Sequence, residues 1–173
     1  MKIDGMLPMY GFSGELTDAQ HTATAKESEM LEHFKSLPDN LDGQIAQLAS
    51  KMTVGATSAS EKATAIRNFL LQNFQFSVEQ RNGLAGDPLM SFLFKDRRGH
   101  CEYFASAFAV LLRSVGVPAR VVGGYQGGIW DQNGQVVVFT GKNAHAWIEW
   151  YLAGVGWVVD DATPMLSAPR ETL

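Results

Sequence analysis

Apolar positions follow a helical period in the first two-thirds of the chain and a strand period in the last third. Up to about residue 115 they recur at spacings of three and four, which is typical of one buried helical face. From residue 119 they alternate with polar residues, as in a half-buried strand. The expected helices span 27–37, 41–51, 58–74 and 101–115, and the expected strands span 119–125, 135–140, 144–152 and 157–161.

This order of elements, helices first and hairpin-linked strands afterwards, predicts an α+β fold with an antiparallel sheet rather than alternating βαβ units. The Asn133-Gly134 pair is a strong hairpin turn signal within the strand region. A length of 173 residues is that of one domain. We expect a loose N-terminal arm over residues 1–25 and a single domain over residues 26–173.

Composition and charge narrow the class of protein. The chain is 46% hydrophobic and 18% charged, with a net charge of −4, which is ordinary for a globular domain. It has no basic run that would favour nucleic-acid binding and no apolar stretch near the roughly 18 residues of a membrane span. The N-terminus lacks the apolar core of a signal peptide. A single cysteine excludes an internal disulfide.

That cysteine, Cys101, stands after Gly99-His100 at the start of the fourth expected helix. The first turn of a helix leaves N–H groups unpaired and carries partial positive charge. Both features favour a thiolate, which is the nucleophilic form, and the N–H groups can also hold an oxyanion. A lone cysteine among apolar residues is more often a buried core residue. Its position at the helix start favours the catalytic interpretation.

A thiolate nucleophile needs a base, and the chain has four histidines. His21 lies in the expected arm, and His33 lies on an expected surface helix. His100 is adjacent to Cys101, and neighbouring helical residues do not face each other. His145, at the start of an expected strand, is therefore the candidate base.

A base is usually oriented by a third group, and Asp160-Asp161 ends the strand expected to pair with that of His145. Pairing Leu152 with Trp157 places Asp160 on the face of His145. A register shifted by one residue places Asp161 there instead. Spacing alone leaves both aspartates open.

Four sequence blocks together resemble the transglutaminase-like superfamily, most closely its bacterial membrane-anchored subgroup. They are Arg98–Ala105 (RGHCEYFA), Gly116–Tyr125 (GVPARVVGGY), Ala144–Glu149 (AHAWIE) and Gly156–Thr163 (GWVVDDAT). All four blocks stand in the order found in the family, and the resemblance covers about residues 36–168.

The resemblance implies a papain-like fold, with the cysteine helix packed on the sheet, and a triad of Cys101, His145 and Asp161. The family pattern Gly-Trp-x-x-x-Asp-Pro-Thr falls on Asp161. This sequence departs from the pattern at Ala162, where proline is usual, and at the additional acid Asp160.

The predicted activity is that of a transglutaminase-type thiol acyltransferase. Cys101 would attack a glutamine carboxamide or a peptide carbonyl and pass the acyl group through a thioester to an amine. The same triad would serve a cysteine protease or amidase with water as acceptor. The sequence is also compatible with a non-catalytic binding module and with an assembly domain of a membrane complex. The expected partner is a protein or peptide substrate, and no cofactor is expected.

The resemblance also predicts an extracytoplasmic, periplasmic location, in a parent protein anchored in the membrane. Because the chain opens directly on a domain without a targeting segment, we expect it to be a piece of that longer protein.

Four further residues are candidates for supporting roles. Trp147 and Trp130 are candidates to line a substrate cleft, although strand aromatics more often pack in a core. Glu102 is a candidate to support the loop around the nucleophile, and Asp160 to support the triad. No cluster of His, Cys, Asp or Glu has the spacing of metal ligands.

Overall fold

The computed structural model describes residues 25–79 and 87–164. The predicted arm over residues 1–25 lies outside these ranges, except for Ala25, which begins the first helix. The helices are α1 (Ala25–His33), α2 (Gly43–Met52), α3 (Ala59–Asn73), α4 (Pro88–Ser91), a π-helix η1 (Phe92–Asp96), α5 (Cys101–Ser114) and a 3₁₀ turn η2 (Gly141–Asn143). The strands are β1 (Gln75–Phe76), β2 (Arg98–Gly99), β3 (Ala119–Tyr125), β4 (Ile129–Asp131), β5 (Val136–Val138), β6 (Ala144–Leu152) and β7 (Gly156–Asp160).

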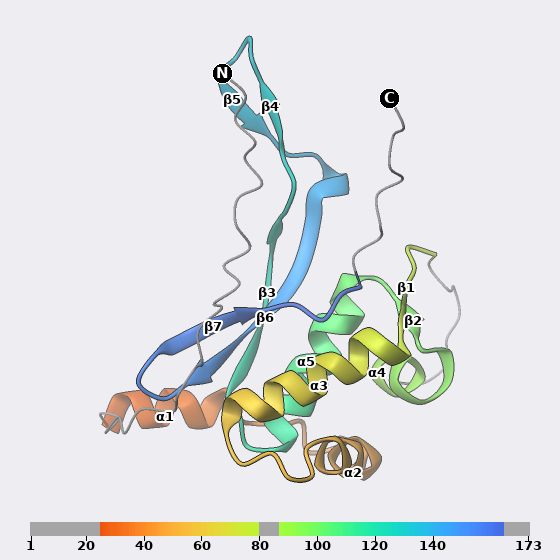
Figure 1. Ribbon diagram of the computed structural model, residues 1–173, viewed down its shortest axis with the longest axis vertical. Coiled ribbons are helices and arrows are strands. Elements are labelled where there is room, and N and C mark those ends of the chain that lie inside the picture. The colour runs from red at the N-terminus through yellow and green to blue at the C-terminus, as the bar shows by residue number, and fades with distance from the viewer. Residues whose placement is uncertain (1–24, 80–86, 165–173) are drawn as a thin grey trace.

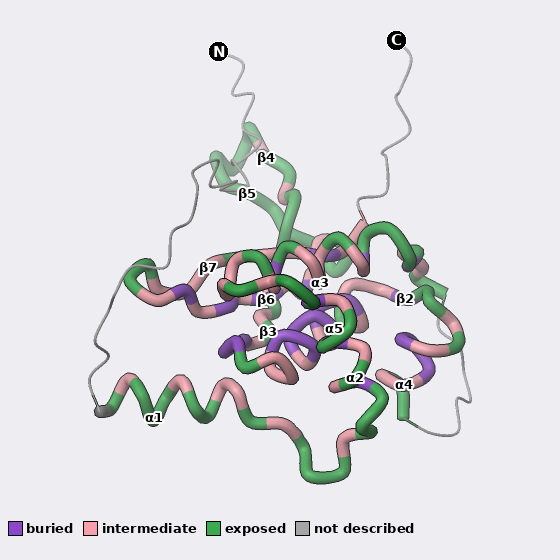
Figure 2. Tube along the Cα trace, turned by 60° about the horizontal axis from the view of Figure 1, so that its bottom comes forward, coloured by how far each residue is buried: buried purple, intermediate pink, exposed green. Residues whose placement is uncertain are grey.

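Helix α5 is the centre of the fold. It packs on β3 and β6 on one side and on α2 and α3 on the other (Figure 1). Its apolar periodicity buries one face almost completely, and these buried residues are Phe104, Ala105, Ala107, Phe108, Ala109, Leu111 and Leu112. Gly116 ends the helix in the left-handed region at φ +81°, and the N–H of Val117 then donates to the Leu112 carbonyl at 3.0 Å. Figure 2 shows buried positions gathered at α5 and its neighbours.

The main sheet has the strand order β3-β6-β7 and is antiparallel throughout. Central strand β6 alternates strictly: Ala146, Ile148, Trp150 and Leu152 are buried, and the residues between them, from His145 to Tyr151, face the opposite side. The predicted α+β class and antiparallel sheet are confirmed. The predicted strand 157–161 is shifted by one residue, because β7 begins at Gly156.

The first helix is shorter than predicted, ending at His33 rather than at residue 37. It lies against the far end of the sheet, where Phe34 packs edge-on against Trp157 and Glu27 accepts a hydrogen bond from the Tyr151 hydroxyl. The predicted capping box of α3 is confirmed, since the Ser58 side chain accepts from the Glu61 N–H at 3.2 Å and Glu61 accepts in return.

The approach to α5 contains structure that the sequence pattern did not predict. The π-helix η1 ends at Arg97, which has a left-handed φ of 50° and donates its N–H to the Phe92 carbonyl at 3.1 Å. Strand β2 follows and pairs in parallel with β1. The segment leading into Cys101 is therefore tied to the end of α3, which restricts how α5 can begin.

Strands β4 and β5 form a separate hairpin that projects from one end of the main sheet (Figure 1). The predicted strand 135–140 was expected in the same sheet, and this expectation is wrong. Only Val136–Val138 are in strand conformation, and they pair with β4. The hairpin carries several exposed apolar side chains, and its green trace in Figure 2 marks the exposure.

Among the described residues, no helix is long and apolar enough to cross a membrane.

Candidate active site

His145 and Asp161 are in direct contact. The Nε2 atom of His145 lies 2.6 Å from Oδ2 of Asp161, and the two side chains are 15% and 22% exposed. The β6–β7 register pairs Tyr151 with Trp157, which is the second of the two registers left open by spacing. Asp161, rather than Asp160, therefore lies on the face of His145.

The other oxygen of Asp161 is also held. The N–H of Thr163 donates to Oδ1 at 2.8 Å, so the carboxylate is fixed at both oxygens. The donor belongs to Thr163, and the bond does not use the N–H of buried Ala162. Alanine in place of the family's proline therefore leaves this contact unaffected.

Trp147 lies beside the imidazole of His145. The ring centroids are 6.1 Å apart and the planes differ by 25°. Gly124 pairs with His145 on β3, and a Cβ atom there would come within 2.7 Å of the indole. The glycine thus makes room for Trp147 beside the imidazole.

Cys101 is the first residue of α5 and is partly buried against the core. His100, before it, has an extended backbone at the N-cap position, and its carbonyl accepts from the Tyr103 N–H at 3.0 Å. Packing of α5 on β6 brings the helix that begins at Cys101 against the strand that carries His145. The contact between the thiol and the imidazole stays a prediction.

The remaining sequence candidates lie in different surroundings. Glu102 is exposed, and its carboxylate is 3.7 Å from Nδ1 of His100, a weak surface pair. Trp130 lies on the projecting hairpin, opposite Val137 in the ladder. No group of three or more His, Cys, Asp or Glu within 25–79 and 87–164 is arranged to hold a metal ion.

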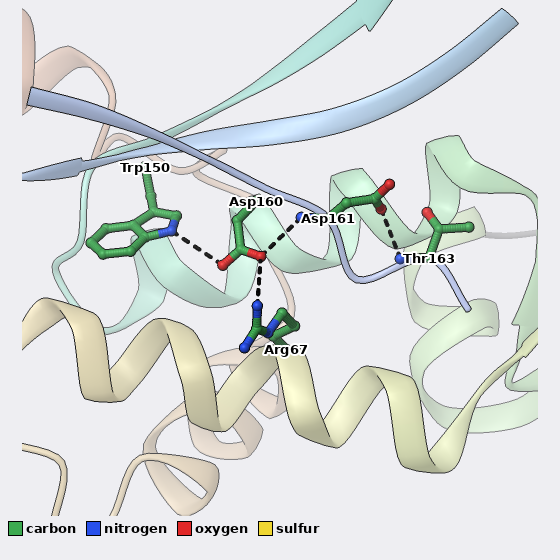
Figure 3. A network of polar contacts seen from close by, with 5 residues as sticks. All are labelled: Arg67, Trp150, Asp160, Asp161 and Thr163. Atoms are coloured by element: carbon green, nitrogen blue, oxygen red, sulfur yellow. Dashed lines mark hydrogen bonds and ion pairs between the residues drawn. The ribbon is translucent and has the colours of Figure 1, made fainter. Parts of the chain in front are cut away.

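Asp160 faces the opposite side of the sheet from Asp161 and binds three donors (Figure 3). Its Oδ1 accepts from the Asp161 N–H at 2.9 Å and from Arg67 Nη1 at 3.4 Å, and its Oδ2 accepts from the Trp150 indole at 3.3 Å. Sequence reasoning missed Arg67. A buried acid calls for a cation, but no local pattern shows which arginine supplies it.

Burial raises the pKa of Asp160, and the charge of Arg67 offsets this only in part. A raised acidic pKa means that the folded state binds the proton more tightly than the unfolded state. Asp160 therefore contributes fully to the free energy of unfolding when the pH is below 3.8, the ordinary pKa of an aspartate. This contribution is lost as the pH rises through the pKa of Asp160 in the folded state.

We therefore expect the free energy of unfolding of the parent, minus that of Asp160→Asn, to fall as pH rises from 3.8. Urea unfolding between pH 3.5 and 8 measures this difference. Glu61→Gln is a control of opposite sign, because hydrogen bonds from Thr57 and Ser58 lower the pKa of Glu61 and its contribution is lost as pH falls. If the free energy of unfolding of the parent minus that of Asp160→Asn rose with pH, burial would not be raising the pKa of Asp160.

The fold and the site together define a class: a papain-like α+β domain with a cysteine at the start of the central helix and a His-Asp pair on the sheet. Residues 46–162 match the family model of the transglutaminase-like superfamily. The chain belongs to this superfamily.

Relatives agree with that assignment. The uncharacterized protein YebA of Bacillus subtilis is 33% identical over 95% of this chain and 23% of its own length. A protein-glutamine gamma-glutamyltransferase of Pseudomonas aeruginosa is 34% identical over 62% of this chain and 16% of its own length. The crystal structure of the periplasmic domain of TgpA from P. aeruginosa superposes with a TM-score of 0.72 at 27% identity, over 78% of this chain and 47% of that one. The chain thus spans less than a quarter of these two curated relatives and about half of the solved domain.

Proposed function

We propose that this chain is the catalytic domain of a transglutaminase-type thiol acyltransferase, with Cys101 as nucleophile, His145 as acid and base, and Asp161 as the group that orients His145. The observation that supports it most is the 2.6 Å contact between His145 Nε2 and Asp161. A carboxylate only accepts hydrogen bonds, so this contact puts a proton on Nε2 and leaves Nδ1 for the thiol.

In the first half of the proposed reaction, the Cys101 thiolate attacks the carbonyl carbon of a glutamine carboxamide. The backbone N–H of Cys101 helps to hold the oxyanion. The C–N bond breaks, His145 gives its Nδ1 proton to the departing nitrogen, and ammonia leaves. A thioester on Cys101 and a neutral imidazole remain.

In the second half, a primary amine attacks the thioester and Nδ1 of His145 takes its proton. The C–S bond breaks, a new amide forms, and the thiolate–imidazolium pair is restored. Water in place of the amine gives a carboxylic acid, and a peptide bond in place of the glutamine gives proteolysis. The residues serve all of these routes equally, so the choice of acceptor depends on access to the thioester.

The gamma-glutamyltransferase name of the Pseudomonas relative supports a glutamine donor and an amine acceptor. The periplasmic location of the TgpA domain supports placing this domain outside the cytoplasmic membrane. A membrane-impermeant maleimide applied to intact cells tests the location, because it reaches Cys101 only if this domain lies outside the cytoplasmic membrane. Labelling of Cys101 only after the cytoplasmic membrane is broken would contradict it.

The proposed activity is tested with a fluorescent primary amine, monodansylcadaverine, and dimethylcasein as glutamine donor. We expect the amine to be incorporated and ammonia to be released in equal amounts. The same protein alkylated at Cys101, its one cysteine, is the matched control and is expected to be inactive. Ammonia release without incorporation would favour the hydrolase. Neither product, with casein or with peptide substrates, would favour a binding or assembly module.

A further inference from the structure

The two adjacent acids at the end of β7 project to opposite faces of the sheet. Asp160 is paired with buried Ile148 and so projects toward the helices, whereas Asp161 projects to the face of His145. Figure 3 shows the Asp160 carboxylate directed at Arg67 on α3, with the Asp161 side chain beyond it. The single peptide unit between Asp160 and Asp161 therefore connects the helix layer to the His-Asp pair.

One contact of Asp160 acts directly on that piece of backbone, and the other two hold its carboxylate in place. Its Oδ1 accepts from the Asp161 N–H at 2.9 Å, which fixes the peptide plane from which the Asp161 side chain departs. The same carboxylate is anchored at both oxygens, by Arg67 on α3 and by the Trp150 indole on β6. The Thr163 N–H then fixes Asp161 from the other side.

We propose that Asp160 is a positioning residue: anchored by Arg67 and Trp150, its carboxylate holds the main chain at Asp161 so that the Asp161 carboxylate stays on Nε2 of His145. The proposal rests on the proposed function for its effect on turnover. The effect of Asp160 on the position of the His145 ring does not depend on that function.

A purely stabilising role explains these contacts less well. The Asp160 side chain is only 12% exposed, and the Arg67 pair is long at 3.4 Å. Taking a carboxylate out of water costs more than such a pair returns. The sheet carries a better ion pair on its other face, where Arg120 and Glu149 meet at 2.6 Å. That pair provides a matched control, since it joins β3 to β6 without contacting the His-Asp pair.

The test compares Asp160→Ala with Glu149→Gln in the full chain, by two measurements. The first is solvent exchange of the imidazole Nε2 proton, seen by NMR in ¹⁵N-labelled protein and assigned by comparison with His145→Ala. The second is kcat and KM for incorporation of monodansylcadaverine into dimethylcasein. Thermal melting checks that each variant is folded.

We expect Asp160→Ala to speed exchange of the Nε2 proton by about tenfold or more and to lower kcat by about 10- to 100-fold with KM unchanged, because small misplacements of a catalytic group are costly. Glu149→Gln is expected to leave both quantities near those of the parent. Unchanged proton exchange in folded Asp160→Ala would overturn the proposal. If the parent has no transferase activity, the proposed function fails, but the exchange measurement still decides the positioning role.

Arg67→Met is a second variant, in case removal of the Asp160 carboxylate prevents folding. It removes the cation and keeps a side chain of similar length, leaving Asp160 bonded to Trp150 and to the Asp161 N–H. We expect faster exchange of the same imidazole proton, by a smaller factor. No change in a folded Arg67→Met protein would show that the anchor on α3 does not reach His145, which also overturns the proposal.

Discussion

Replacing His145 by alanine is expected to lower kcat for amine incorporation by about two to four orders of magnitude, the usual worth of a general acid–base group. Both half-reactions lose their general acid or base, because in the proposed mechanism Nδ1 of His145 donates the proton in the first half and accepts it in the second. The thiolate also loses its imidazolium partner. Turnover with monodansylcadaverine and dimethylcasein measures the first effect.

The second effect is measured without any substrate. The rate of Cys101 alkylation by iodoacetamide, followed by intact mass between pH 5 and 9, reports the thiolate alone, since the chain has one cysteine. We expect alkylation to be faster in the parent than in His145→Ala, because the proposed mechanism pairs the thiolate with the imidazolium of His145. His33→Ala, on exposed α1, is the matched control. Identical profiles for the parent and His145→Ala would mean that the two side chains do not interact.

The identity of the orienting acid shows where sequence reasoning reaches its limit. Alternation placed one of the two aspartates on the face of His145, but a shift of one residue exchanges them. The turn decides: Gly154 and Gly156 both have left-handed φ values, and Leu152 pairs with Gly156 rather than with Trp157. Glycines permit this turn but do not show in the sequence which register it produces. The family pattern, by contrast, pointed to Asp161.

Regular, amphipathic elements were predictable because their own pattern reveals the buried face. The bounds of β3 and β6 agree with the prediction, and α5 begins at Cys101 as expected. The π-helix η1 was missed because five residues are too few to show a period, and its conformation depends on tertiary packing. Strand β5 lies within the predicted strand 135–140, whereas β4 was not predicted, and alternation does not tell which sheet a strand joins.

The pairing of Arg67 with Asp160 lay beyond prediction for a related reason. The two residues are 93 positions apart, and Arg67 reads as an ordinary polar position of α3. Its importance arises only when α3 packs beside the end of β7. Contacts that connect separate layers are set by the tertiary arrangement, and for this reason no sequence pattern pointed to Arg67.

Among single substitutions in the core, Phe92→Ala is expected to lower the free energy of unfolding by about 3–5 kcal/mol, the usual cost of emptying a buried phenylalanine site. Phe92 is 1% exposed and its ring packs against Phe74 at 4.8 Å, Phe104 at 5.1 Å and Tyr103 at 5.6 Å. Because two of these partners lie in the first turn of α5, the cavity would open beneath the helix that begins at Cys101.

Urea unfolding followed by circular dichroism measures this loss, with Phe139→Ala as the control of equal volume change. Phe139 is 47% exposed at the projecting hairpin, so its removal creates no closed cavity and is expected to cost about 1 kcal/mol or less. A loss of several kcal/mol is a large part of the roughly 5–15 kcal/mol that stabilises a domain of this kind. Equal losses in the two variants would mean that the aromatic cluster under α5 is not the packed core described.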